Sequence, residues 1–114
     1  MAAHPGSEAD KLARQLMGRE IARAHAEGTD PLVLVGLGQL NDADELLFVQ
    51  LQSPGECGSA GCSTVSFRYG GDQWIRIMDT VSGAVQIAQS RHRGMPDLIV
   101  NGNRRVWDGT KYPG

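Results

Sequence analysis

Residues 64–72 have the sequence Thr64-Val65-Ser66-Phe67-Arg68-Tyr69-Gly70-Gly71-Asp72. Polar and apolar side chains alternate over the first six positions, which is the period of a β-strand with one buried face. The Gly-Gly-Asp step that follows is typical of a tight hairpin turn. This stretch therefore predicts a strand that turns back into an antiparallel neighbour.

Short runs of the same kind lie on both sides of it. The chain has 15 glycines among 114 residues, and they cluster between apolar runs, where tight turns need them. Asn101-Gly102-Asn103 is a second hairpin signal. Because short connections favour antiparallel neighbours, we predict a meander-like sheet of six or seven short strands. They cover residues 32–38, 45–52, 64–69, 73–80, 84–90, 98–101 and 104–107.

One helix is predicted before the sheet, over residues 8–27. Ser7 is suited to cap its first turn, and the early acids Glu8 and Asp10 suit the positive end of the helix dipole. Gly28, followed by Pro31, is a natural stop. Apolar side chains recur at helical spacing and form one stripe: Ala9, Leu12, Ala13, Leu16, Ile21 and Ala24. We therefore expect an α+β fold with one N-terminal helix packed on a single antiparallel sheet.

Length and charge limit what the protein can do. A chain of 114 residues predicts a single domain, with a flexible N-terminus over residues 1–6 and an antiparallel β region over residues 32–112. The 11 basic and 13 acidic residues give a net charge of -2 without a basic stripe, so we expect no nucleic-acid partner. The longest apolar runs, 32–35 and 46–49, are too short to cross a bilayer.

Cys57 and Cys62 are the two cysteines of the chain. Two glycines between them let the backbone turn sharply enough to bring the sulfurs within bonding distance, so we predict a disulfide. A reduced structural pair, a redox-active pair and a metal site are the alternatives, although the scattered histidines lack ligand spacing. A disulfide indicates an oxidising compartment. Residues 2–6 look like a mature N-terminus behind an added methionine, so we expect a periplasmic or secreted protein whose signal peptide has been removed.

The motifs around this loop resemble those of a loose group of small exported bacterial proteins, mostly of unknown function. They are the acidic turn at 41–45, Ser53-Pro54, the Cys-Gly-x-x-Gly-Cys loop, Trp74, the segment 94–98 and Trp107-Asp108-Gly109. The resemblance covers roughly residues 38–112 and leaves out the helix. The acid-and-strand units at 45–49 and 97–100 also look like degenerate calcium-associated hairpins of integrin-type (FG-GAP-like) β-propellers. One such unit cannot close a propeller in this length, so the resemblance implies a shared local hairpin.

Two candidate chemistries are weak. Asn41, Asp42, Asp44 and Glu45 offer oxygen ligands suited to calcium, but the turn lacks a glycine and has Gln39 where such loops want Asp. We expect an ordinary acidic turn, no tight metal site and no change in melting temperature on adding calcium.

Ser90, His92 and Asp97 could form a Ser/His/Asp triad, yet residues this close along one turn rarely adopt that geometry. No enzyme activity and no cofactor are therefore predicted.

The sequence favours a non-catalytic binding protein. The leading hypothesis is an exported inhibitor or immunity protein that acts on a cell-wall-degrading enzyme such as a peptidoglycan hydrolase. The alternative is a structural or assembly module of the cell envelope that self-associates or packs on a larger partner. A rigid disulfide loop loses little entropy on binding, and arginines donate well to carboxylates. The predicted partner-binding residues are Gly58, Ser59, Ala60, Gly61, Arg91, His92, Arg93 and Trp107, with Trp107 also a candidate for the core.

Overall fold

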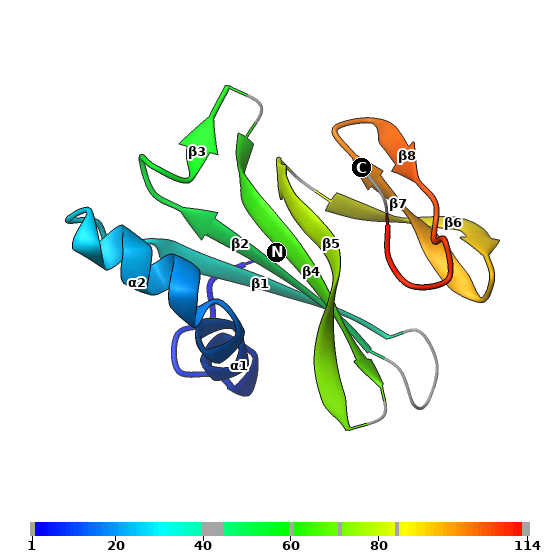
Figure 1. The fold of residues 1–114 in the computed structure, drawn as a ribbon, viewed down its shortest axis with the longest axis horizontal. Coiled ribbons are helices and arrows are strands. Elements are labelled where there is room, and N and C mark those ends of the chain that lie inside the picture. The colour runs from blue at the N-terminus through cyan, green and yellow to red at the C-terminus, as the bar shows by residue number, and fades with distance from the viewer. Residues whose placement is uncertain (1, 40–44, 60, 71, 84, 113–114) are drawn as a thin grey trace.

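The described part of the chain forms two helices and two antiparallel sheets arranged in three layers (Figure 1). This computed structural model describes residues 2–39, 45–59, 61–70, 72–83 and 85–112. The predicted fold, one helix on a single sheet, is wrong in both of its parts. The helix divides beside a glycine and the sheet divides at one, and the antiparallel pairing of the strands is confirmed.

The predicted helix over residues 8–27 is divided into α1 (Glu8–Leu16) and α2 (Gly18–Ala26). Ser7 caps α1 as expected, because its side chain accepts a hydrogen bond from the Asp10 amide at 3.1 Å. The division falls at Met17, whose backbone leaves the helical region with φ -102° and ψ 20°. Gly18 follows directly, and glycine stabilises a helix less than any other residue except proline. The apolar stripe runs through both helices, but the chain bends between them.

The first sheet lies at the centre of the molecule. It contains β1 (Leu32–Gln39), β2 (Glu45–Gln52), β4 (Gly61–Gly70) and β5 (Gln73–Ser82). β4 pairs with both β2 and β5, and the short β3 (Cys57–Gly58), which the sequence did not predict, pairs with its start. The predicted hairpin over residues 64–80 is therefore present.

The second sheet contains β6 (Val85–His92), β7 (Met95–Val100) and β8 (Asn103–Arg105). It separates from the first sheet at Gly83, where φ is 107° and the amide donates to the Cys62 carbonyl at 2.9 Å. A short connection gives an antiparallel neighbour only if the chain folds back on itself, and here the chain turns a corner instead. Bends of this kind are how strands pass from one packed sheet to another.

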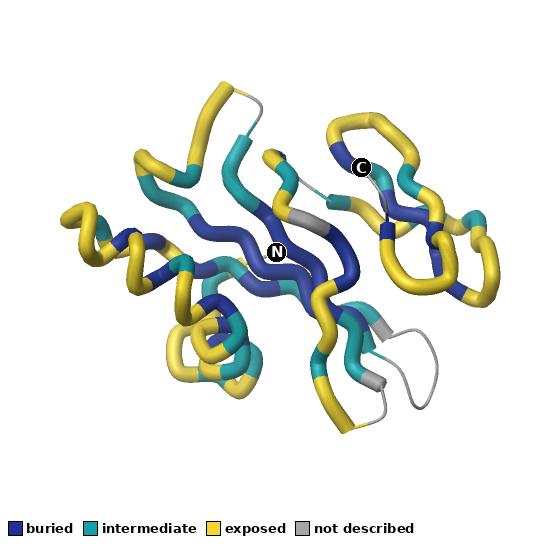
Figure 2. Tube along the Cα trace, in the orientation of Figure 1, coloured by how far each residue is buried: buried dark blue, intermediate teal, exposed yellow. Residues whose placement is uncertain are grey.

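Both faces of the first sheet are covered, and residues 46–51 of β2 are all buried (Figure 2). Leu47, Val49 and Leu51 pack in one cluster with the helices. Leu46 and Phe48 pack in a second cluster with residues of the second sheet. A strand that is buried on both faces has a continuous apolar run rather than an alternating pattern.

The polar side of the 64–69 alternation is also buried. Thr64 and Ser66 have no exposed surface, because they lie opposite Gln50 and Phe48 of β2, on the face that the second sheet covers. The Thr64 hydroxyl donates to the Gly83 carbonyl at 2.7 Å and accepts from the Gln50 amide at 3.0 Å. Thr64, Gln50 and the Gly83 carbonyl therefore form internal hydrogen bonds at the corner between the sheets.

Candidate functional site

The turn between β6 and β7 carries three of the predicted binding residues, Arg91, His92 and Arg93. His92 pairs with Met95, so Arg93 and Gly94 occupy the two turn positions, with φ of 53° and 81°. Two successive residues with positive φ match the type I′ hairpin turn, whose twist fits that of the flanking strands. The local sequence thus fixes a tight turn and projects the basic side chains from the end of the second sheet.

Asp97 of β7 organises the side chains behind this turn. It has no exposed surface. Ser90 donates to Oδ2 at 2.7 Å, His92 Nδ1 lies 2.7 Å from Oδ1, and Arg104 Nη1 lies 3.4 Å from Oδ2. Because a carboxylate only accepts, His92 bonds Asp97 through a protonated Nδ1. The hydrogen bond holds one nitrogen of the imidazole, and the His92 side chain remains 53% exposed.

This cluster is not a catalytic triad. In a triad the serine bonds the histidine, and the histidine bonds the acid. Here Ser90 and His92 each bond a different oxygen of Asp97, and among the described residues no hydrogen bond joins the serine to the histidine. Arg104 also donates to the Ser90 hydroxyl, at 2.7 Å. The arrangement orients a histidine and an arginine around a buried carboxylate.

The same contacts set the ionisation of Asp97. Hydrogen bonds from Ser90 and then His92 hold the pKa of the Asp97 carboxyl below its ordinary value of 3.8. Burial opposes them, and the positive charges of His92 and Arg104 act in the same direction as the hydrogen bonds. Asp97 is therefore a carboxylate at neutral pH.

The two arginines of the turn are also tied to the backbone. Arg91 donates from Nη1 to the Gly94 carbonyl at 3.1 Å, across the turn. Arg93 donates from Nη1 to the Asp108 carbonyl at 3.2 Å. Each guanidinium has five N–H donors, so both groups keep donors that point to solvent. Three consecutive basic side chains are thus fastened at one point and remain exposed.

Charge is distributed unevenly along the chain. Residues 85–112 contain five Lys or Arg and two Asp or Glu, a formal charge of +3, whereas residues 1–84 contain six and eleven, a formal charge of -5. The second sheet and its flanking turns are therefore a cationic part of an anionic protein. Such a separation attracts acidic partners to that end of the molecule.

The predicted disulfide between Cys57 and Cys62 is confirmed. It closes the β3–β4 hairpin, where the two residues pair directly. Gly58 and Ser59 are exposed, Gly61 packs against Gly83, and Ala60 lies outside the described residues. This loop and the β6–β7 turn lie on opposite sides of the molecule (Figure 1). The structure therefore does not bring the two predicted binding loops together.

Trp107 belongs to the core and not to the surface. Its exposed fraction is 5%. Its ring makes an edge contact with Tyr112, with 5.2 Å between the ring centroids, and the Arg68 guanidinium lies 5.7 Å from the ring. Of the two roles open to Trp107 in the sequence, the structure places it in the core cluster between the sheets.

The predicted calcium candidates Asn41, Asp42 and Asp44 lie outside the described residues. Glu45 is described, and it stands at the start of β2. Among the side chains that the structure describes, no three His, Cys, Asp or Glu residues are grouped closely enough to hold a metal ion.

Sequence reasoning missed Arg104 and Arg105 and the central role of Asp97. The sequence did indicate that both arginines directly follow a hairpin turn, the predicted Asn-Gly-Asn turn. Only the register of β7 and β8 shows that Arg104 lies opposite Ile99 and Arg105 opposite Leu98. The two arginines therefore project from different faces of the second sheet.

Comparison of the chain with models of protein families, with curated protein sequences and with solved structures gave no match. Among the described residues, neither helix has the length and continuous apolar character that crossing a bilayer requires.

Proposed function

We propose that this protein is a non-catalytic binding protein that acts outside the cytoplasm, as an inhibitor or immunity protein of a cell-wall-degrading enzyme. The observation that carries the proposal is the β6–β7 turn, where Arg91, His92 and Arg93 are each fixed by a hydrogen bond yet exposed. Side chains that are already ordered lose less entropy when a partner binds. The binding surface is therefore this turn, without Trp107.

The chemistry of the proposed partner follows from the charge of the turn. Glycosidases cleave their substrates between a pair of Asp or Glu side chains in a cleft. A narrow, cationic hairpin is complementary in shape and charge to such a cleft, and guanidinium groups form two parallel hydrogen bonds with carboxylates. The anionic remainder of the chain favours one orientation of approach.

The site of action is proposed from the disulfide. Disulfides persist in oxidising compartments, which include the bacterial periplasm and the exterior of the cell. The Cys57–Cys62 bond lies at an exposed hairpin, where the thiol reductants of a reducing compartment would reach it directly. A periplasmic or secreted location also places the protein beside the cell wall.

Lysis assays test the proposal. Wild-type protein, an Arg91→Glu/Arg93→Glu variant and a Lys11→Glu/Arg19→Glu control are added to peptidoglycan suspensions with a panel of purified peptidoglycan glycosidases. Wild type should slow the clearing of turbidity by at least one enzyme. Reversal at the turn should weaken inhibition by about tenfold or more, because like charges then face the cleft. The control changes the same number of charges on the exposed helix surface and should inhibit like wild type.

Two outcomes contradict the proposal. One is that wild type leaves the lysis rate unchanged with every enzyme of the panel. The other is that the turn variant, folded by circular dichroism, inhibits as strongly as wild type.

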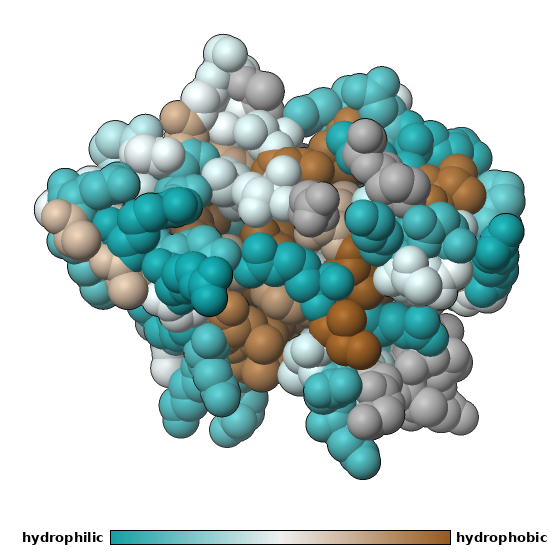
Figure 3. Space-filling model, in the orientation of Figure 1, coloured by the Kyte–Doolittle hydropathy of each residue, from teal (hydrophilic) through white to brown (hydrophobic). Residues whose placement is uncertain are grey.

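The alternative, a structural or assembly module that self-associates, is favoured by the edge of the first sheet. Beyond its pairing with β2, β1 is bridged in the described part of the chain only by Ala2, at Val35. Leu32 and Leu37 of β1 are 50% and 61% exposed, and exposed edge strands are templates for pairing. Figure 3 shows apolar side chains gathered over the first sheet between the hydrophilic helices and the second sheet. Analytical sedimentation tests this alternative. If the wild-type protein is a dimer and the Leu37→Lys variant is a monomer, this function is supported.

A further inference from the structure

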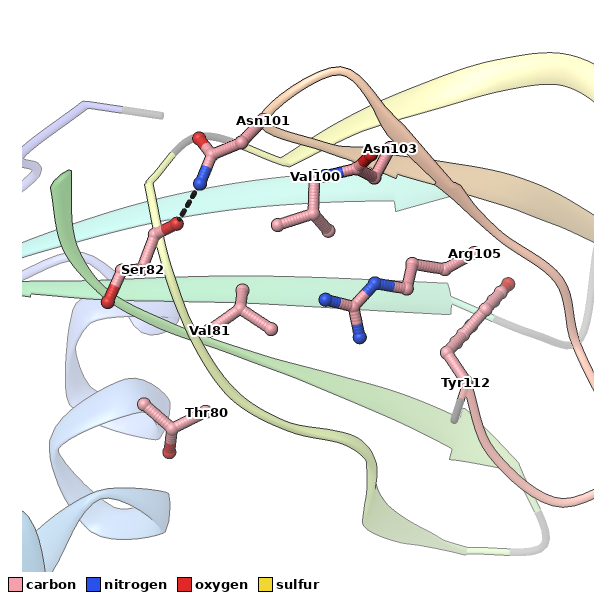
Figure 4. Close-up of a pocket in the computed structure, with 8 residues that line it drawn as sticks. All are labelled: Thr80, Val81, Ser82, Val100, Asn101, Asn103, Arg105 and Tyr112. Carbon is pink, nitrogen blue, oxygen red and sulfur yellow. Dashed lines mark hydrogen bonds between the residues drawn. The ribbon is translucent and has the colours of Figure 1, made fainter. Parts of the chain in front are cut away.

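A pocket of about 370 Å³ lies where the end of β5 meets β7 and β8 (Figure 4). Val81 and Val100 form apolar walls, and Asn101, Asn103 and Arg105 supply polar groups. Pockets that hold small ligands are mostly apolar with a few placed polar groups, and this volume lies at the lower end of their range. The pocket is therefore large enough for a small molecule or for the end of a peptide.

Arg105 gives the pocket its charge. Its side chain is half-buried and enters the pocket between Val81 and Tyr112 (Figure 4). Within the described ranges, no carboxylate or carbonyl accepts a hydrogen bond from it, and no Asp or Glu lines the pocket. A cation that is partly removed from water loses hydration, and an anionic partner that forms hydrogen bonds with it offsets that cost.

The side-chain amides of Asn101 and Asn103, which also line the pocket, can take part in binding an anion. Asn101 donates from Nδ2 to the Ser82 carbonyl, which links the β7–β8 turn to the end of β5 and fixes this amide at the rim of the pocket (Figure 4). The Asn103 side chain lies on the far side of Val100 in the same view. Amide groups on the two sides of Val100 can receive the polar atoms that adjoin a bound carboxylate (Figure 4).

We propose that this pocket binds a carboxylate that carries a small apolar group. The Arg105 fork pairs with the carboxylate oxygens, and Val81 and Val100 contact the apolar part. Two sources supply this chemistry, a free carboxylic acid and the C-terminal residue of a peptide. The site lies at the opposite end of β7 from the β6–β7 turn, so it does not depend on the proposed inhibitory function.

Two-dimensional ¹⁵N nuclear magnetic resonance of the whole protein tests the site. The probes are isovalerate, N-acetyl-Ala-Val with a free C-terminus, and the same dipeptide as its C-terminal amide. The acids should give saturable shifts of the Asn101 and Asn103 side-chain amides, and the dipeptide amide should not. A dipeptide acid that binds much tighter than isovalerate identifies a peptide end as the ligand, and equal binding identifies a free acid.

Variants locate the interaction. Arg105→Gln should weaken binding by about tenfold or more, Arg105→Lys should weaken it less, and Arg19→Gln, an exposed helix position with the same loss of charge, should have no effect. The Arg105→Lys variant, which keeps the charge, retains the test if the glutamine variant fails to fold. Equal binding by the folded Arg105 variants and wild type, or no saturable shift with either acid, would overturn the proposal.

Discussion

Asp97 is a charged side chain with no exposed surface, and its three partners explain how it is tolerated. Ser90, His92 and Arg104 donate to its two oxygens, so the cost of removing the carboxylate from water is offset by hydrogen bonds that favour its ionised form. The sequence showed these residues only as a polar loop before a strand. Their convergence depends on the pairing of three strands.

Asp97→Asn should lower the free energy of unfolding at pH 7, because the amide cannot accept from all three donors as a carboxylate does. The pKa of Asp97 is lower in the folded protein than its ordinary value of 3.8. Its ionisation therefore adds stability above that pH, and this stability is lost as pH falls through the lower, folded-state pKa. Urea denaturation at several pH values should show the two proteins converging in acid. A constant difference down to pH 2 would contradict this role.

Gly61→Ala should be strongly destabilising. An added methyl group would lie 2.5 Å from the Gly83 Cα and 2.8 Å from its nitrogen. Gly61 also has φ of 117°, a backbone conformation that is strained for residues other than glycine. We expect a loss of roughly 2 kcal/mol from backbone displacement and strain, measured by urea denaturation. Gly58→Ala in the same loop meets nothing within 4 Å and is the control. If both variants had wild-type stability, the contact between the loop and the corner would be disproved.

At the scale of elements, the break between α1 and α2 combines a local and a tertiary cause. Gly18 weakens the helix locally. Met17 is 1% exposed, so its burial in the core cluster with the first sheet holds the chain at the bend. The prediction of one continuous helix rested on a cap, a stop and the apolar stripe between them, and that stripe is compatible with one straight helix and with two helices joined by a bend.

Gly18→Ala should raise the stability by roughly 0.5 kcal/mol, because alanine has the higher helix propensity and its methyl group meets nothing within 4 Å. The bend should remain, since Met17 stays buried. Thermal denaturation by far-ultraviolet circular dichroism measures the change. A lower melting temperature would show that residue 18 needs the freedom of glycine.

At the scale of the whole molecule, Tyr112 connects the two sheets. Its amide donates to the Ile77 carbonyl of β5 at 2.7 Å, and its hydroxyl donates to the Pro96 carbonyl of β7 at 2.6 Å. Burial, with a smaller effect of the Asp97 charge, raises the pKa of the Tyr112 hydroxyl to about 12. A residue near the end of the chain thus closes the contact between layers.

Tyr112→Phe should lower the stability by roughly 1 kcal/mol, because the Pro96 carbonyl loses its donor. In wild type the raised pKa means that stability is complete below pH 10, the ordinary value, and is lost as pH rises through about 12. Titration of tyrosinate absorbance should show one group ionising near pH 12. This group should be missing in the phenylalanine variant, and its persistence there would refute the assignment.

The two sheets should unfold as one unit, because one apolar cluster contains residues of both. Trp74 packs against the helix-side cluster, and Trp107 lies in the cluster between the sheets. In Trp107→Phe and Trp74→Phe, the remaining tryptophan reports one region. Within each variant, urea transitions by fluorescence and by far-ultraviolet circular dichroism should coincide. Separate midpoints would show that the sheets unfold independently.

Much of the local structure was determined by the sequence alone. The Ser7 cap, the hairpin after Tyr69, the strand at 45–52 and the Cys57–Cys62 disulfide each depend on residues close together along the chain. Capping, turn geometry and closure of a short loop are satisfied by a few neighbouring residues, so a pattern is enough to predict them. The sequence grouped the proposed binding residues Arg91, His92 and Arg93 for the same reason, since they belong to one turn.

Tertiary structure alone decided how these pieces are layered. Periodicity shows that a strand such as β2 is apolar, but not that the helices cover one face and a second sheet the other. The corner at Gly83, the burial of Trp107 and the placement of Arg105 in a pocket all depend on contacts between distant segments. Those contacts arise from packing two sheets against each other, and a turn signal in the sequence does not record whether the next strand stays in its sheet or leaves it.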